Sequence, residues 1–112
     1  MQAEDRIRIQ HMVEAAFAAQ GFMTGRQRAD LDRDQMLLFA VVRAIEIVGE
    51  AASRVSAETR AATPQIPWPA IVGMRNRVVH AYFDIDREIV WTTVIAELPL
   101  LVAGLRAALG EG

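Results

Sequence analysis

The stretch that decides the fold is Met36–Val55, which reads MLLFAVVRAIEIVGEAASRV. Its apolar residues repeat with the helical period and cover a broad face: they are Met36, Leu37, Phe39, Ala40, Ile47, Val48, Ala51 and Val55. A helix that is apolar over so wide an arc is packed on more than one side. We therefore expect this helix in the centre of the fold. Asp32 and Gln35, three residues apart, resemble a capping box at its start.

A second helix is expected before this one, from Ala3 to Gln20, with apolar residues at roughly helical spacing and Gly21 as its C-cap glycine. Phe22–Leu31 is predicted to be a loop. After the central helix, the segment Ser56–Pro69 contains three prolines, so we expect no helix to cross it.

A third helix is predicted over Pro69–Tyr82, with Pro69 tolerated in its first turn. Asp84 and Asp86 are candidate caps of a fourth helix, which extends through Leu105. Pro99 inside this helix predicts a kink. We find no convincing strand, and four helices with short links predict an all-α, up-and-down bundle.

Bulk composition fits one domain over residues 1–112, since 53% of the residues are apolar and a core is possible at this length. No apolar run approaches the roughly 20 residues of a membrane helix, and no signal peptide is recognisable, so we expect a soluble, cytoplasmic protein without membrane contact. The net charge of −2 argues against a protein that coats nucleic acid, although it allows a local basic groove. All twelve basic residues are arginines, so a single arginine carries less information than usual.

The absence of cysteine excludes disulfides and thiolate metal sites, and the chain has only two histidines. His11, midway along the first predicted helix, is interpreted as a surface or packing residue. We therefore expect neither a metal nor another cofactor.

The residues best suited to chemistry form the segment Arg75–Tyr82, RNRVVHAY. Arginine presents a rigid fork of donors to phosphate oxygens, and histidine titrates near neutral pH and can take or give a proton. Such a set suits a phosphodiester. The competing interpretation is structural: a histidine near a helix C-terminus, stabilised by the helix dipole, with surface arginines nearby.

Helical geometry constrains this segment. Asn76 and His80 share a face, and Arg75 and Tyr82 do as well, whereas Arg75 and His80 lie roughly 140° apart around a helix axis. Three alternatives bring Arg75 and His80 together. The helix loosens near His80, the long Arg75 side chain wraps round, or a second copy of the chain completes the site.

The central helix also carries a polar stripe of Arg43, Glu46 and Glu50. This stripe is either a solvated face, on which Glu50 pairs with Arg54, or a set of supporting groups in which Glu46 or Glu50 reaches the third helix and orients Arg75.

Two separated stretches resemble the HepT-like family, within the HEPN superfamily of nucleases. They are Ile45–Ala52, IEIVGEAA, and Ile66–Asp86, IPWPAIVGMRNRVVHAYFDID. The resemblance continues through Glu88–Trp91 and Leu98–Pro99 and covers most of the chain.

The family pattern is an arginine, four to six residues, a histidine and, one residue later, a tyrosine. Arg75, His80 and Tyr82 fill these positions, and Asn76 is the polar residue expected after the arginine. Ala81 departs from the glycine common in relatives, which matters little because alanine is the better helix former.

This resemblance implies a HEPN-like helical homodimer that cleaves RNA without a metal, as an endoribonuclease. His80 would be the general base or general acid, Arg75 would stabilise charge on the phosphorane, and Asn76 would position one of them. Arg77 is a further candidate for RNA binding. Attack by the 2′-hydroxyl leaves a 2′,3′-cyclic phosphate.

The resemblance further implies the toxin of a type VII-like toxin–antitoxin system, whose nucleotidyltransferase antitoxin adenylylates Tyr82. The rival interpretation is a non-catalytic companion of a nucleotidyltransferase, in which Arg75 and His80 bind a phosphate or nucleotide without cleavage. The third interpretation is a structural helical bundle that binds no ligand.

Overall fold

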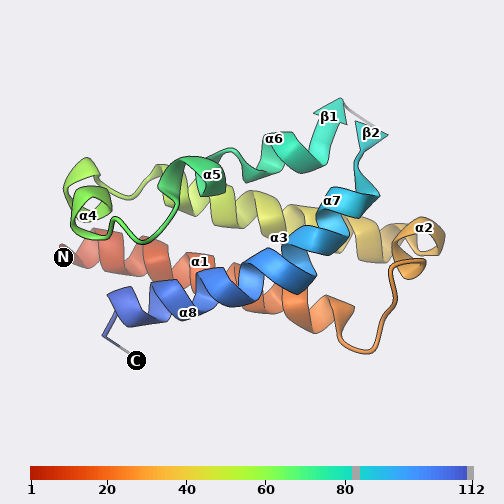
Figure 1. Cartoon of the computed structure of the whole chain (residues 1–112), viewed down its shortest axis with the longest axis horizontal. Coiled ribbons are helices and arrows are strands. Elements are labelled where there is room, and N and C mark those ends of the chain that lie inside the picture. The colour runs from red at the N-terminus through yellow and green to blue at the C-terminus, as the bar shows by residue number, and fades with distance from the viewer. Residues whose placement is uncertain (82–83, 111–112) are drawn as a thin grey trace.

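A computed structural model of the chain describes residues 1–81 and 84–110 (Figure 1). Its centre is α3 (Gln35–Ser53), as predicted, and ten of its residues are buried. Met36 and Phe39 of the predicted apolar face are nevertheless exposed. Asp34 caps this helix, because its carboxylate accepts a hydrogen bond from the Leu37 amide at 3.0 Å. The predicted capping box at Asp32 is therefore wrong: Asp32 belongs to the short helix α2 (Asp30–Arg33), which begins within the last two residues of the predicted loop.

Helix α1 (Ala3–Met23) packs along α3, and the two lie side by side in Figure 1. Its buried stripe includes Ala15, Ala16 and Ala19, whose small side chains allow a close approach. The predicted C-cap at Gly21 is wrong, since the helix continues past it to Met23. The chain turns at Gly25 instead, whose φ of 74° is in the left-handed region that favours glycine.

The first turn of α1 is tied to α4 (Ala57–Ala62), a short helix within the segment predicted to be a break. The Asp5 carboxylate is buried and accepts hydrogen bonds from the Ser56 amide at 2.9 Å and from the Ser56 and Thr59 hydroxyls at 2.6 Å each. These bonds lower the pKa of Asp5, chiefly through the Ser56 side chain. The buried carboxylate thus joins segments more than 50 residues apart in the sequence.

The predicted third helix is two short helices, α5 (Trp68–Val72) and α6 (Met74–Val78), with Pro69 in the first turn of α5 as expected. Helix α5 lies close to α3 at Gly49, where an added Cβ would stand 3.3 Å from the Ile71 carbonyl oxygen. Glycine at this position therefore lets the chain carrying the Arg75–Tyr82 segment sit directly on α3.

The prediction that this helix extends to Tyr82 is wrong, and so is the expectation of no strand. Strand β1 (Val79–Ala81) follows α6 and pairs antiparallel with β2 (Asp84–Ile85), with a register irregularity between Val79 and Ala81. The Asp86 amide also donates to the Val78 carbonyl at 2.7 Å. The β-branched residue Val79 favours the extended form, and pairing of β1 with β2 fixes it.

The last long segment comprises α7 (Arg87–Thr92), a π-helical turn η1 (Thr93–Glu97) and α8 (Leu98–Ala108). Asp86 caps α7 by accepting from the Ile89 amide at 3.0 Å, as one of the two predicted caps. The disturbance predicted around Pro99 takes the form of the π-helical turn that precedes it.

Residues Arg87–Ala108 together form one helical stretch that is long and apolar enough to cross a membrane. Length and composition alone do not distinguish a membrane span from a core helix. This stretch buries Val90, Val94, Leu98 and Leu105 against the rest of the protein. The predicted all-helical class thus holds for most of the described chain, with α1, α3 and α8 packed together, and the strand pair is the exception.

Candidate functional site

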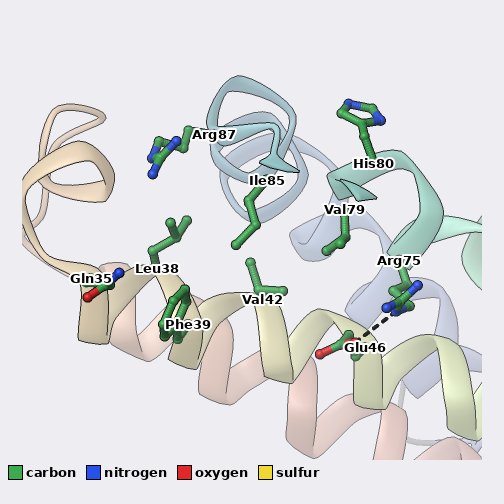
Figure 2. A pocket seen from close by; sticks show the side chains of 10 residues that line it. All are labelled: Gln35, Leu38, Phe39, Val42, Glu46, Arg75, Val79, His80, Ile85 and Arg87. Atoms are coloured by element: carbon green, nitrogen blue, oxygen red, sulfur yellow. Dashed lines mark hydrogen bonds and ion pairs between the residues drawn. The ribbon is translucent and has the colours of Figure 1, made fainter. Parts of the chain in front are cut away.

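A cleft of about 650 Å³ lies between α3 on one side and β1, β2 and the start of α7 on the other (Figure 2). Its lining combines apolar side chains with groups able to bind or transfer protons. The lining residues are Gln35, Leu38, Phe39, Val42, Glu46, Arg75, Val79, His80, Ile85 and Arg87. Two of the predicted catalytic residues, Arg75 and His80, therefore border one cavity.

Arg75, near the start of α6, points toward α3 (Figure 2). Its Nε donates a hydrogen bond to Glu46 Oε2 at 2.9 Å. The Arg75 side chain is about half exposed, and that of Glu46 is 23% exposed. Because the contact engages Nε, the two terminal nitrogens stay available for a phosphate. Of the two glutamates in the polar stripe, Glu46 is thus the one that reaches Arg75.

His80 is exposed on β1, and its Nε2 lies 3.4 Å from Asp86 Oδ2. The same carboxylate caps α7 through its other oxygen, Oδ1. The pKa of Asp86 is lowered, first by the bond from the Ile89 amide and then by His80. Asp86, predicted only as a cap, therefore also fixes one side of the histidine ring.

The side chains of Arg75 and His80 diverge within one chain: Arg75 is directed at α3, while His80 points away from it (Figure 2). The helix does end between them, at Val78, which agrees with the first of the three alternatives. That change of backbone does not by itself turn both groups toward one atom. Completion of the site by a second copy remains a prediction.

The other predicted residues are distributed over several faces. Asn76 is exposed beside Arg75 on α6. Arg77 donates to Glu97 at 3.2 Å and lines a separate groove between α5, α6 and α8. Glu50 accepts from Arg43 at 3.1 Å, rather than from Arg54, in a shallow pocket that also contains His11. Tyr82 lies outside the described residues.

Seven of the ten lining residues were not predicted as site residues: Gln35, Leu38, Phe39, Val42, Val79, Ile85 and Arg87. A signal for three of these was present, because the spacing of one helix face connects Gln35, Phe39 and Val42 to Glu46. Phe39 was assigned to the core, yet it is 49% exposed at the cleft. The positions of Ile85 and Arg87 at the cleft depend on the pairing of β1 with β2. A continuous helix to Tyr82, as predicted from the sequence, does not include that pairing.

Within residues 1–81 and 84–110, no group of three or more histidine, aspartate or glutamate residues is arranged to hold a metal ion. The charged and titratable side chains that line the cleft are Arg75, Arg87, His80 and Glu46. An arginine and a histidine that border one cleft suit the cleavage of a phosphodiester by acid–base catalysis.

The structure defines a mostly helical domain in which an arginine and a histidine border one cleft. A family model described as "Ribonuclease HepT-like" matches residues 12–108. The chain belongs to the HepT-like ribonuclease family.

Relatives of this chain carry matching names. It is 40% identical over 68 residues to "Probable ribonuclease HepT" of Thermococcus cleftensis, covering 61% of this chain and 62% of that protein. It is 39% identical over 72 residues to "Putative RNase TTE0752" of Caldanaerobacter subterraneus subsp. tengcongensis, covering 64% of each. The matches thus span less than two thirds of these relatives. No solved structure matches the chain.

Proposed function

We propose that this chain is a metal-independent endoribonuclease and the toxin of a type VII-like toxin–antitoxin system acting in the cytoplasm. The observation that supports this most is the placement of Arg75 and His80 on one cleft in a chain of the HepT-like family. A 2′-hydroxyl attacks the adjacent phosphorus, and the bond from phosphorus to the 5′-oxygen breaks. The products are a 2′,3′-cyclic phosphate and a 5′-hydroxyl.

His80 either accepts the proton of the 2′-hydroxyl or donates one to the leaving 5′-oxygen. Arg75 stabilises negative charge on the phosphorane through its terminal nitrogens. Glu46 and Asp86 act as positioning residues, holding Arg75 and His80 respectively. Asn76 and Arg77 are assigned to positioning and RNA binding near α6.

The active form in this proposal is a homodimer. The divergence of Arg75 and His80 in one chain favours a composite site, in which one copy supplies the arginine and the other copy supplies the histidine. Large apolar side chains are also exposed, including Met36 at the start of α3, Ile95 in η1 and Leu100 in α8. Sedimentation is expected to give a dimer at micromolar concentration, and an active monomer would contradict this part of the proposal.

Silencing by a nucleotidyltransferase antitoxin completes the proposal. The antitoxin transfers an adenylyl group from ATP to the Tyr82 oxygen and releases pyrophosphate. The modification adds bulk and negative charge two residues from His80, where it opposes binding of an RNA phosphate.

The test is expression of the chain alone and together with the nucleotidyltransferase encoded beside it, with growth and RNA integrity as readouts. Growth arrest with RNA cleavage that persists in EDTA, relieved by co-expression, supports the proposal. Strict dependence of cleavage on an added divalent ion would contradict the mechanism.

The second candidate is a non-catalytic companion of a nucleotidyltransferase, and the divergence of Arg75 and His80 is the observation that favours it. Under this alternative the purified chain binds nucleotides or phosphate but leaves RNA intact at every protein concentration. The same expression experiment therefore separates the two candidates.

A further inference from the structure

The middle of the cleft is apolar and holds a half-exposed aromatic ring. Leu38 and Val42 form a buried floor, at 2% and 6% exposure, while Phe39 beside them is 49% exposed. Val79 and Ile85 close the opposite wall and pack on the core. A large ring left open to solvent beside an apolar floor offers a surface on which a flat ligand can stack.

The two ends of the cleft are polar and each carries a guanidinium. Figure 2 shows Gln35 and Arg87 at one end, and Arg75 with Glu46 at the other. The Arg87 side chain is 43% exposed and lies 3.6 Å from Asp32. Cationic groups at both ends of an apolar, aromatic centre match a single nucleic-acid strand, with phosphates at the ends and a base between them.

We infer that this cleft is a nucleobase subsite for single-stranded RNA next to the bond that is cut. Phe39 stacks on the base, Gln35 hydrogen-bonds to its edge, and Arg87 contacts a neighbouring phosphate. The inference rests on the proposed function, in which Arg75 at the other end of the cleft binds the scissile phosphate and the second copy of the chain supplies the histidine. The subsite makes Phe39 and Gln35 the residues that set which nucleotide is preferred beside the scissile bond.

The dimensions agree with this assignment. The volume of about 650 Å³ falls within the range typical of small-ligand sites. Phe39 precedes Glu46 by seven residues, which is about 10 Å along α3. The stacking surface is therefore set apart from the Arg75–Glu46 pair, so one nucleotide can engage its base and its phosphate at separate points.

A second copy of the chain is the competing occupant of this cleft. A stable protein interface is depleted of charged groups at its centre, because those groups lose their hydration there. The rim of the cleft carries Arg75, Arg87 and Glu46. Charges confined to a rim also occur at protein interfaces, so the preference for RNA rests on the match between the two guanidiniums and the phosphates of one strand.

The test uses a labelled single-stranded 2′-O-methyl oligoribonucleotide, which lacks the free 2′-hydroxyl and cannot be cut by the proposed route. Its affinity is measured for the full-length parent, Phe39→Ala, Phe39→Trp and Phe22→Ala. Phe22 is the matched control, since it is 43% exposed on α1 and does not line the cleft. Cleavage of unmodified RNA and sedimentation are measured in parallel.

We expect Phe39→Ala to weaken binding by about tenfold or more, as for loss of one stacked base. Phe39→Trp keeps a stacking face and should bind as the parent does, and Phe22→Ala should be unchanged. Gln35→Ala should reduce the difference in affinity between homopolymers of different bases, because it removes the group that contacts the base edge.

The failures of the two proposals are distinguishable. If the parent cuts RNA but Phe39→Ala binds the probe as well as Phe22→Ala, the base subsite is wrong and the ribonuclease stands. If binding depends on Phe39 but no RNA is cut, the proposed ribonuclease activity fails and the subsite stands. Dissociation of a dimer by Phe39→Ala would make the cleft an interface and overturn the subsite.

Discussion

Glu46 holds Arg75 at 2.9 Å across 29 positions of sequence, and the contact joins the central helix to the predicted catalytic segment. The carboxylate occupies Nε and leaves the outer edge of the guanidinium facing the cleft. A free arginine side chain has many rotamers. Because Glu46 fixes one of them, Arg75 loses less conformational entropy when a phosphate binds. Glu46 is therefore a positioning residue.

Glu46→Ala is expected to lower kcat for RNA cleavage by about 10- to 100-fold, the equivalent of a hydrogen bond to a charged group. Glu46→Gln retains an acceptor for Arg75 Nε and should recover part of the loss. Glu50→Ala is the matched control, because Glu50 lies about one helical turn beyond Glu46, does not line the cleft and pairs with Arg43 instead. Equal effects of the Glu46 and Glu50 changes would contradict the assignment.

Arg75→Ala and His80→Ala are each expected to remove RNA cleavage while leaving the fold intact. Both side chains are exposed, so neither change opens a cavity. A positioned acid–base group contributes about 10²- to 10⁴-fold to rate. We would measure the cleavage rate of each variant, purified free of other nucleases, and check its fold by circular dichroism. Parental rates in His80→Ala would exclude the mechanism.

Asp86 performs two tasks, and two substitutions separate them. Asp86→Asn keeps an N-cap for α7, whereas Asp86→Ala loses it. We expect both to slow cleavage, because both remove the negative charge beside His80. The thermal melting temperature should fall clearly for the alanine variant alone. Full activity in Asp86→Asn would show that the contact with His80 has no role in catalysis.

The sequence predicts the parts of this fold that depend on local periodicity. Helix α3 follows from its apolar face, and the contact of the polar stripe with Arg75 was one of two options. The end of α6 at Val78 was missed, because it depends on pairing between β1 and β2 and on the bond from the Asp86 amide. The role of Phe39 was missed because helical period does not reveal which part of a broad apolar face meets an open cleft.

Asp5 was missed for a related reason, since its partners lie 51 and 54 positions away. Its pKa is lowered in the folded protein, so the folded state binds the proton less readily than the unfolded chain does. The stability that this carboxylate contributes is fully present above the unfolded pKa of about 3.9. It is lost as the pH falls through the lower, folded pKa.

Asp5→Asn is therefore expected to lower the melting temperature at pH 7 and to reduce its further fall toward pH 3. Removing hydrogen bonds to a buried charge costs about 1.5–3 kcal/mol at neutral pH. Glu4→Gln is the control, because Glu4 is an exposed neighbour in the same turn. Thermal melts between pH 3 and pH 7 make the comparison. Parallel pH curves for the parent and Asp5→Asn would contradict the role given to Asp5.

The last prediction concerns Tyr82, which follows His80 by two residues in the sequence. A phenol with a pKa near 10 is a weak nucleophile unless a base or cation assists it. We propose that Arg75 favours the phenolate and that His80 accepts the proton. Tyr82→Phe should keep most of the ribonuclease activity, because no catalytic role is assigned to the hydroxyl. It should escape neutralisation, because the oxygen that accepts the adenylyl group is gone.

Intact-mass measurement after co-expression with the nucleotidyltransferase tests this directly. The parent should gain adenylyl mass that peptide mapping places on Tyr82, and growth should recover. Tyr82→Phe should gain none and stay toxic, while His80→Ala should be harmless with or without the antitoxin. If Tyr82→Phe is neutralised as well as the parent, the antitoxin silences the ribonuclease by binding alone, and the oxygen of Tyr82 has no part in it.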